Sequence, residues 1–303
     1  MRPQLPTRRR VLAGAMASLL LARAAPARAA AKARVVATFS ILADLVSNVA
    51  DGRVEIETLV GPDSDAHVYA PTPADAKRLG AAALVFVNGL GFEGWLARLI
   101  KASGTRARIV TATRGIKPRQ MPEGHDRGGI DPHAWQSVAN AKIYVGNVRD
   151  ALIEADGSGE PAYRAAAASY SGMLDALDEE VRAAVAKIPA EHRKIITTHD
   201  AFGYFQDAYG LAFIAPEGVS TDAEPSARDV ARIIAQIRSQ RIPAVFLENI
   251  ADPRLPERIA AETGAKIGGT LYSDALTGPG GEAPTYIAMM RHNIRVLTEA
   301  LTS

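Results

Sequence analysis

Three of the six histidines stand in loop-like settings where an imidazole could bind a metal ion. These are His67, His133 and His199, and each follows a strand-like or turn-rich segment. A fourth candidate ligand, Asp274, ends another strand-like segment. Three imidazole nitrogens and one carboxylate oxygen suit tetrahedral zinc, because manganese and magnesium prefer more oxygen donors. The residue types therefore indicate a zinc site, although the spacing alone leaves open that each histidine is a surface residue.

Acidic residues lie close to all three histidines in the sequence. They are Asp65, Asp131 and Asp200. Asp131 and Asp200 could each accept a hydrogen bond from a ligand imidazole and so orient the ring. Helix capping or turn formation would explain both residues equally well. We therefore treat the three acids as auxiliary candidates, not as ligands.

Strand-like and helix-like patterns alternate in the segments around these residues. Residues 34–40, 54–60 and 82–88 are short apolar runs typical of strands, whereas residues 41–50 have helical spacing. This alternation predicts βαβ units and a parallel sheet. Ligands of open parallel sheets bind beyond the carboxyl ends of the strands. The candidate ligands stand where the pattern places those ends.

A long helical segment separates two halves of similar pattern. Residues 160–187 are rich in Ala, Leu, Glu and Arg and predict one helix of about 40 Å, more a rod than a packing element. After it, residues 194–198 resemble residues 34–40, and residues 244–249 resemble residues 84–88. The sequence therefore predicts an α/β fold with two lobes. Each lobe has a parallel-type sheet flanked by helices, one long rigid helix joins them, and the metal site lies in the cleft between them.

The first 29 residues have the layout of a signal peptide. They contain six arginines and no acidic residue, and the apolar stretch 11–21 is too short to span a bilayer. The paired arginines favour a twin-arginine signal, and a frayed helix of a cytosolic protein is the alternative. The rest of the chain is net acidic and has no basic run, so we expect no nucleic-acid partner.

The chain contains no cysteine, which excludes disulfides, a thiolate metal site and a lipidated cysteine. We expect an exported, soluble, monomeric protein of the periplasm without a lipid anchor. The predicted domains are a signal peptide (1–29), an N-terminal α/β lobe (30–157), a linking helix (158–188) and a C-terminal α/β lobe (189–303).

Four ordered motifs resemble those of the zinc- and manganese-binding solute receptors of ABC importers, the cluster A-I family. The motifs are Asp65-x-His67-x-Tyr69-x-Pro71-x-Pro73-x-Asp75, Asp131-Pro132-His133-x-Trp135, Thr198-His199-Asp200-Ala201-Phe202-x-Tyr204-Phe205 and Leu271-Tyr272-x-Asp274. The resemblance covers the whole mature chain and implies a metal ion clamped between the lobes. It implies His67 and His133 as ligands from the first lobe, and His199 and Asp274 from the second.

The third ligand position separates metals within this family. Manganese receptors of the family carry a carboxylate there, whereas this chain has His199, and a neutral imidazole removes one hard anionic donor. The resemblance therefore implies a high-affinity receptor that carries Zn²⁺ as its transported ligand to the membrane permease of an ABC importer. A periplasmic metallochaperone is a further candidate partner.

Three alternatives remain open at this point: a receptor for manganese or another divalent ion, a zinc-dependent hydrolase, and a metal-dependent adhesin or chaperone. A catalytic zinc needs an open coordination position and a general base, and the sequence has no H-E-x-x-H motif. We therefore expect no enzymatic activity.

His125 is the one histidine in residues 118–129, where many zinc receptors of the family carry a histidine-rich loop. It could collect zinc weakly and pass it inward, or it is a solvated loop residue.

Overall fold

Two parallel sheets of four strands organise the part of the chain that this computed structural model describes, residues 32–121, 129–222 and 225–302. The strand order is β2-β1-β3-β4 in the first sheet and β8-β7-β9-β10 in the second. In each sheet the strand that comes first in the chain lies inside the sheet. The second strand forms the edge on one side of it, and the third and fourth strands follow on the opposite side. The similarity of the two halves in the sequence is thus present in their topology, and the predicted fold class is confirmed.

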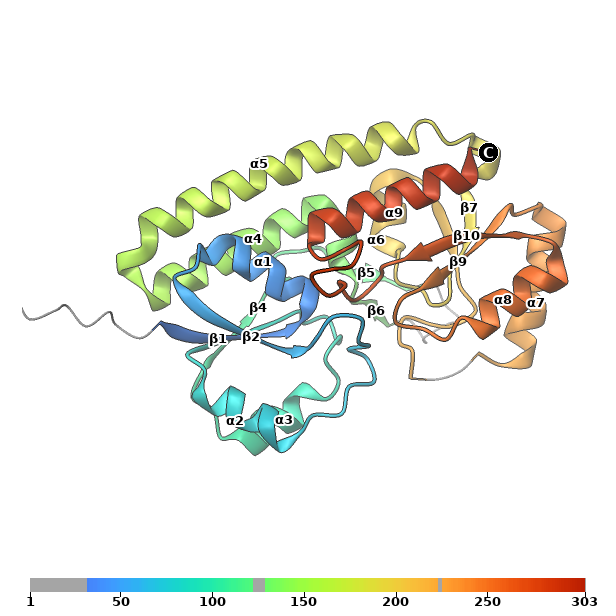
Figure 1. Ribbon diagram of the computed structural model, residues 1–303. Coiled ribbons are helices and arrows are strands. Elements are labelled where there is room, and N and C mark those ends of the chain that lie inside the picture. The colour runs from blue at the N-terminus through green and yellow to red at the C-terminus, as the bar shows by residue number, and fades with distance from the viewer. Residues whose placement is uncertain (1–31, 122–128, 223–224, 303) are drawn as a thin grey trace, which may run out of the picture. The chain divides into compact units, whose positions relative to one another are not determined.

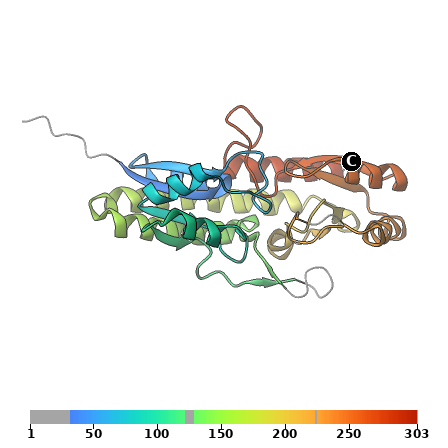
Figure 2. The same ribbon diagram turned by 90° about the horizontal axis from the view of Figure 1, so that it is seen from below.

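The strands lie close to the predicted segments. The first sheet contains β1 (Ala33–Phe39), β2 (Val54–Val60), β3 (Leu84–Val87) and β4 (Arg108–Thr111). The second contains β7 (Lys194–Ile196), β8 (Ala212–Ile214), β9 (Ala244–Glu248) and β10 (Lys266–Leu271). A short antiparallel ribbon, β5 (Arg119–Gln120) and β6 (Ile130–Asp131), projects from the first half (Figure 2).

Helices cover both faces of each sheet (Figure 1). The first sheet is flanked by α1 (Ser40–Ala50) and α4 (Val138–Ala155) on one face, and by α2 (Pro73–Ala81) and α3 (Leu96–Ser103) on the other. The second is flanked by α6 (Gly203–Tyr209) and α9 (Tyr286–Leu301), and by α7 (Ala227–Gln240) and α8 (Arg254–Thr263). Short 3₁₀ turns are η1 (Ala134–Gln136), η2 (Gly157–Gly159) and η3 (Ala190–His192).

The long helix α5 (Glu160–Val185) contains 26 residues and joins the two halves. Every third or fourth residue along it is buried, namely Tyr163, Ala167, Tyr170, Leu174, Leu177, Val181 and Val185. This stripe packs against α4 and α1 of the first half and α9 of the second (Figure 1). The expectation of a rod rather than a packing element was therefore wrong, because an apolar stripe at helical spacing packs along the whole length of α5.

The main hydrophobic core runs through both halves without interruption. It contains residues of β1, α1 and α4 from the first half, of α5, and of α6 and α9 from the second. A smaller separate cluster lies under α7 and α8 and consists of Ile196, Ile233, Ile237, Ile242, Val245, Ile259 and Ala260. The predicted lobe boundaries at residues 157 and 188 stay a prediction, since this main core crosses both.

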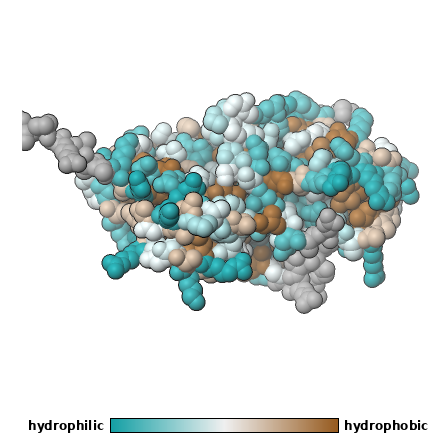
Figure 3. Space-filling view, turned by 60° about the horizontal axis from the view of Figure 1, so that its bottom comes forward, coloured by the Kyte–Doolittle hydropathy of each residue, from teal (hydrophilic) through white to brown (hydrophobic). Residues whose placement is uncertain are grey.

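The face shown in Figure 3 is largely hydrophilic, with apolar residues in small separate patches. Among the helices of the described residues, none combines the length and the apolar character that crossing a membrane requires. The predicted signal peptide lies outside the described residues.

Candidate metal centre

Four side chains from the two halves converge between the sheets. His67 lies in the loop after β2, His133 directly before η1, His199 in the loop after β7, and Asp274 in the segment after β10. One candidate ligand atom from each lies within 4.8 Å of all the others. His133, His199 and Asp274 are fully buried, and only 4% of the His67 side chain is exposed. The structure therefore brings together the four residues predicted as ligands.

Four of the six distances between the donor atoms lie between 3.0 and 3.5 Å. Asp274 Oδ2 lies 3.0 Å from His67 Nε2, 3.2 Å from His199 Nε2 and 3.5 Å from His133 Nε2. The Nε2 atoms of His67 and His133 are 3.2 Å apart. Bonds of about 2.0–2.1 Å to a tetrahedral zinc ion would place donor atoms about 3.3–3.4 Å apart. The four separations given above are close to this value, and all donor pairs lie within 4.8 Å.

Buried carboxylates make the centre attractive to positive charge. Burial alone would lower the pKa of His133, but Asp274 and Asp131 outweigh it and raise this pKa to about 9. Burial likewise opposes the charged form of His199, yet Glu248 and Asp274 raise its pKa well above the usual value. The raised pKa values of His133 and His199 favour their protonated forms, so a metal ion would compete with protons for these imidazoles.

Asp131 supports His133 from behind. Its Oδ1 accepts hydrogen bonds from the ring Nδ1 and from the backbone N of His133, both at 2.9 Å. This contact fixes the ring orientation and leaves Nε2 facing the centre. Asp131 therefore lies where a residue that orients the His133 ring must lie, as considered from the sequence.

Glu248, at the end of β9, has the corresponding place behind His199. Its Oε1 accepts hydrogen bonds from the backbone N of Thr198 (2.8 Å) and of His199 (3.0 Å). Its Oε2 lies 2.7 Å from His199 Nδ1, a short ionic contact in which the ring is not aligned for a good hydrogen bond.

From the sequence, Asp200 was the candidate for orienting the His199 ring, and Glu248 was not identified. The backbone N of Asp200 donates to Gly218 O, and burial together with the charge of Asp131 raises the pKa of its carboxyl. Glu248 is an acidic residue at the end of the apolar segment 244–249, whose pattern resembles that of residues 84–88. This position was the signal in the sequence that could have identified it.

The loop that carries His67 is held at its backbone. Asp65 Oδ1 accepts from the backbone N of His67 (2.8 Å), and Asp65 Oδ2 accepts from the Thr221 hydroxyl of the second half. Trp95 Nε1 donates to Ala66 O (2.8 Å). Asp65 therefore shapes the loop and links it to the other half, and does not orient the imidazole ring.

The same loop runs into α2, which begins with a capping box. Thr72 is the N-cap, and Pro73 follows it at the first helical position. Asp75 Oδ2 accepts from the backbone N of Thr72 (2.7 Å) and from the Tyr69 hydroxyl (2.8 Å). One carboxylate therefore ties the start of α2 to the segment two residues after His67.

The segment that carries Asp274 is held from both halves. Trp135 Nε1 and Gln136 Nε2 of the first half donate to Ser273 O, at 2.9 and 2.7 Å. Asn293 also bonds with Tyr272, and the Ser40 hydroxyl accepts from the backbone N of Leu276. Among the described residues, Asp274 Oδ1 is a buried oxygen with no hydrogen-bond partner. It is free to act as a further donor atom to a cation.

The two other described histidines lie away from the centre. His192 Nδ1 contacts Leu301 O, and His292 Nε2 contacts Thr270 O. His125, the candidate for collecting zinc, lies outside the described residues.

Comparison with known proteins gives one family. Residues 35–300 match the family model described as "ZnuA: Zinc-uptake complex component A periplasmic". The iron-binding protein YfeA of Yersinia pestis is 34% identical over 280 residues, which cover 92% of this chain and 89% of that protein. The manganese-binding lipoprotein MntA of Halalkalibacterium halodurans is 32% identical over 269 residues, which cover 89% and 88%.

A zinc-binding relative is known in sequence and in structure. The zinc-binding protein TroA of Treponema pallidum is 34% identical over 281 residues, which cover 91% of each protein. The solved structure of periplasmic zinc-binding TroA superposes with a TM-score of 0.85 at 32% identity, covering 90% of this chain and 100% of that one. Similar proteins are thus named for zinc, manganese and iron.

Proposed function

This chain belongs to the ZnuA family of periplasmic metal-binding receptors of ABC transporters, and from this premise we propose that its cargo is Zn²⁺. Members of the family are solute-binding proteins, not enzymes, so the hydrolase alternative falls away. In this proposal His67, His133, His199 and Asp274 are the zinc ligands. The receptor delivers the ion to the membrane permease of its importer.

The observation that carries the choice of zinc is the donor set with its geometry. Three imidazole nitrogens and one carboxylate oxygen converge within 4.8 Å of one another, and the carboxylate oxygen lies 3.0 to 3.5 Å from each nitrogen. Zinc favours nitrogen-rich tetrahedral sites, whereas manganese favours more oxygen donors and higher coordination numbers.

A receptor for Mn²⁺ or Fe²⁺ is the second candidate, and one feature of the site favours it. Asp274 Oδ1 is buried and has no hydrogen-bond partner among the described residues, so the carboxylate could bind a metal ion through both oxygens. Two oxygens and three nitrogens would make a five-coordinate site, which suits these larger ions better. Relatives named for manganese and iron agree with this alternative.

Three expectations about the cellular setting stay predictions. They are monomeric state, supply by a periplasmic metallochaperone, and export without a lipid anchor. Several relatives are named as lipoproteins, so the absence of an anchor needs its own test.

Competitive loading of the chain without residues 1–29 tests the proposal. The protein is stripped with a chelator, offered equimolar Zn²⁺, Mn²⁺ and Fe²⁺ under anaerobic conditions, and analysed for bound elements. We expect one zinc per chain, and its loss or weakening in His199→Ala. His192→Ala removes an imidazole outside the centre and should retain the zinc. Preferential loading with manganese or iron would overturn the choice of zinc, and no stoichiometric metal would overturn the ligand set.

A further inference from the structure

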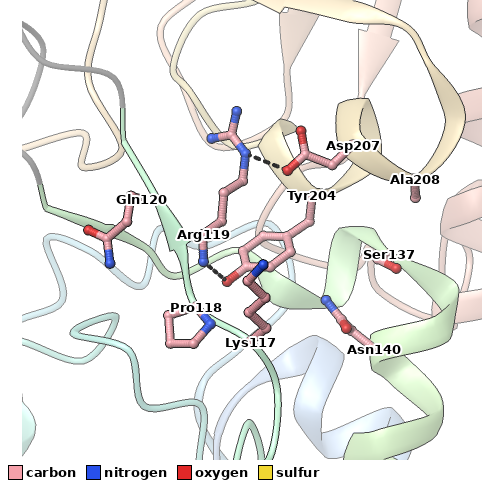
Figure 4. A pocket seen from close by; sticks show the side chains of 9 residues that line it. All are labelled: Lys117, Pro118, Arg119, Gln120, Ser137, Asn140, Tyr204, Asp207 and Ala208. Atoms are coloured by element: carbon pink, nitrogen blue, oxygen red, sulfur yellow. Dashed lines mark hydrogen bonds and ion pairs between the residues drawn. The ribbon is translucent and has the colours of Figure 1, made fainter.

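Arg119 lies where the two halves meet beside the metal centre. It belongs to the β5–β6 ribbon of the first half, and its side chain is 15% exposed. Its Nε donates to Asp207 Oδ2 (3.1 Å), and its backbone N donates to the Tyr204 hydroxyl (2.9 Å). Asp207 and Tyr204 both belong to α6 of the second half (Figure 4). One residue of the ribbon therefore holds α6 at two points.

The same guanidinium reaches the carboxylate behind His133. Arg119 Nη1 lies 3.4 Å from Asp131 Oδ2, while Asp131 Oδ1 faces the ring of His133 at 2.9 Å. Asp131 is fully buried, and a buried carboxylate is costly unless charge and hydrogen bonds compensate it. Arg119 supplies a permanent positive charge that does not depend on the state of the metal centre.

The start of α6 packs closely on this pair. A Cβ added to Gly203, the first residue of α6, would overlap Arg119 Nη1 and Asp131 Oδ2. The backbone of α6 therefore lies directly on the ion pair, and α6 follows the loop that carries His199. A cavity of about 500 Å³ lies beside the pair, lined in part by Asn140, Asp207 and Arg119 (Figure 4).

From these contacts we propose that Arg119 is a positioning residue that slows metal release. It fixes Asp131, and through it the ring of His133, while it ties the second half to the first through Asp207 and Tyr204. The inference rests on the proposed function as a metal receptor. Loss of Arg119 would leave Asp131 buried without its compensating cation and would free α6 from the ribbon, so ligands from both halves would separate more often.

The rate of zinc release measures this role. Zinc-loaded protein is mixed with an excess of a chromophoric chelator in a stopped-flow instrument, and the dissociation rate is recorded. We expect Arg119→Gln to raise this rate about tenfold, as changes to groups that orient metal ligands typically do. Arg119→Lys should raise the rate less than Arg119→Gln does, because an ammonium group can pair with one carboxylate but cannot bridge two.

A double-mutant cycle with Asp207 separates the bridge from general packing. Because 58% of the Asp207 side chain is exposed, Asp207→Asn should raise the release rate only about twofold. The double variant Arg119→Gln/Asp207→Asn should release zinc no faster than Arg119→Gln alone, since both changes remove the same contact. Arg164→Gln, which removes an exposed arginine of α5 paired with Glu160, is the matched control and should leave the rate unchanged.

The outcomes distinguish this inference from the proposed function. Unchanged zinc release in folded Arg119→Gln, with an unchanged melting temperature of the metal-free protein, overturns the inference and leaves the function standing. If Arg119→Gln does not fold, the cycle between Arg119→Lys and Asp207→Asn decides, and strictly additive effects overturn the inference. Failure of the wild-type protein to bind zinc overturns the proposed function.

Discussion

At the scale of single residues, the centre depends on carboxylates that do not face the metal position. Asp131 and Glu248 lie behind His133 and His199, one from each half, and each is fully or almost fully buried. Such carboxylates fix the ring orientation and increase the basicity of the donor nitrogen. The properties of the centre are therefore set by more residues than the four that converge on it.

We expect Glu248→Gln to weaken zinc binding about 10- to 100-fold without changing the stoichiometry of one ion per chain. The reason is that the charge behind His199 is lost while the side chain keeps its size. Competition with a chelator of known affinity measures the change. Glu299→Gln, at an exposed i,i+4 pair with Arg295 on α9, is the control and should bind as the wild type does. Equal affinity of both variants would mean that Glu248 only shapes the backbone after β7.

Residue types and motifs were enough to predict the four converging side chains, but not the groups behind them. Three imidazoles and a carboxylate indicated a metal set, and the motifs of the family resemblance selected its members. Glu248 lies 49 residues from His199, and their contact depends on the pairing of β7 with β9. No local pattern encodes that pairing. For the same reason Asp200, the sequence neighbour of His199, was considered in its place.

At the scale of elements, the start of α2 links local helix chemistry to the His67 loop. Burial alone would raise the pKa of Asp75, but hydrogen bonds from Thr72 and Tyr69 and the charge of Arg78 outweigh it and lower this pKa. A carboxyl whose pKa is lower in the folded state stabilises the protein above its unfolded pKa. That stabilisation is lost as the pH falls through the folded value.

We therefore expect Asp75→Asn to reduce the free energy of unfolding by about 1 kcal/mol at pH 7, as the loss of a capping charge does. The difference from wild type should shrink as the pH falls below about 4, where the unfolded carboxyl becomes protonated. Urea unfolding at several pH values measures it. Asp150→Asn, at an exposed residue of α4, is the control. If the difference in the free energy of unfolding between wild type and Asp75→Asn stays the same in acid, the ionised Asp75 carboxylate is not its source.

Local signals predicted the elements better than their arrangement. The composition of residues 160–187 predicted the helix that is α5, because helix propensity depends on the residues of the segment itself. The common strand order of the two sheets depends on contacts between distant segments. Segments of similar sequence pattern, such as 194–198 and 34–40, nevertheless take equivalent places, β7 and β1, in the two sheets.

At the scale of the whole molecule, the shared core predicts cooperative unfolding. The buried stripe of α5 packs against helices of both halves, so neither half can lose its structure without exposing that stripe. Domains that unfold independently need separate cores, and in the described residues the main core is common to both halves.

Leu174→Ala tests this cooperativity, because Leu174 is fully buried near the middle of α5. We expect a loss of about 2–5 kcal/mol in the free energy of unfolding. We also expect a single calorimetric transition in the metal-free protein, before and after the change. Met173→Ala, at the adjacent residue whose side chain is 47% exposed, is the control and should change the free energy by less than about 0.5 kcal/mol. Two transitions, of which Leu174→Ala moves only one, would show that the halves unfold separately.

The equal division of donors between the two sheets has a consequence for chelation. In the proposed site each half supplies two of the four donor side chains, and two donors complete only half of a tetrahedral shell. Neither half alone would retain the ion against water, and two separate half-chains would first have to meet. By joining them, α5 turns that encounter into an intramolecular one with a high effective concentration of the second donor pair. The affinity of the site is in this sense a property of the covalent connection as much as of the ligands.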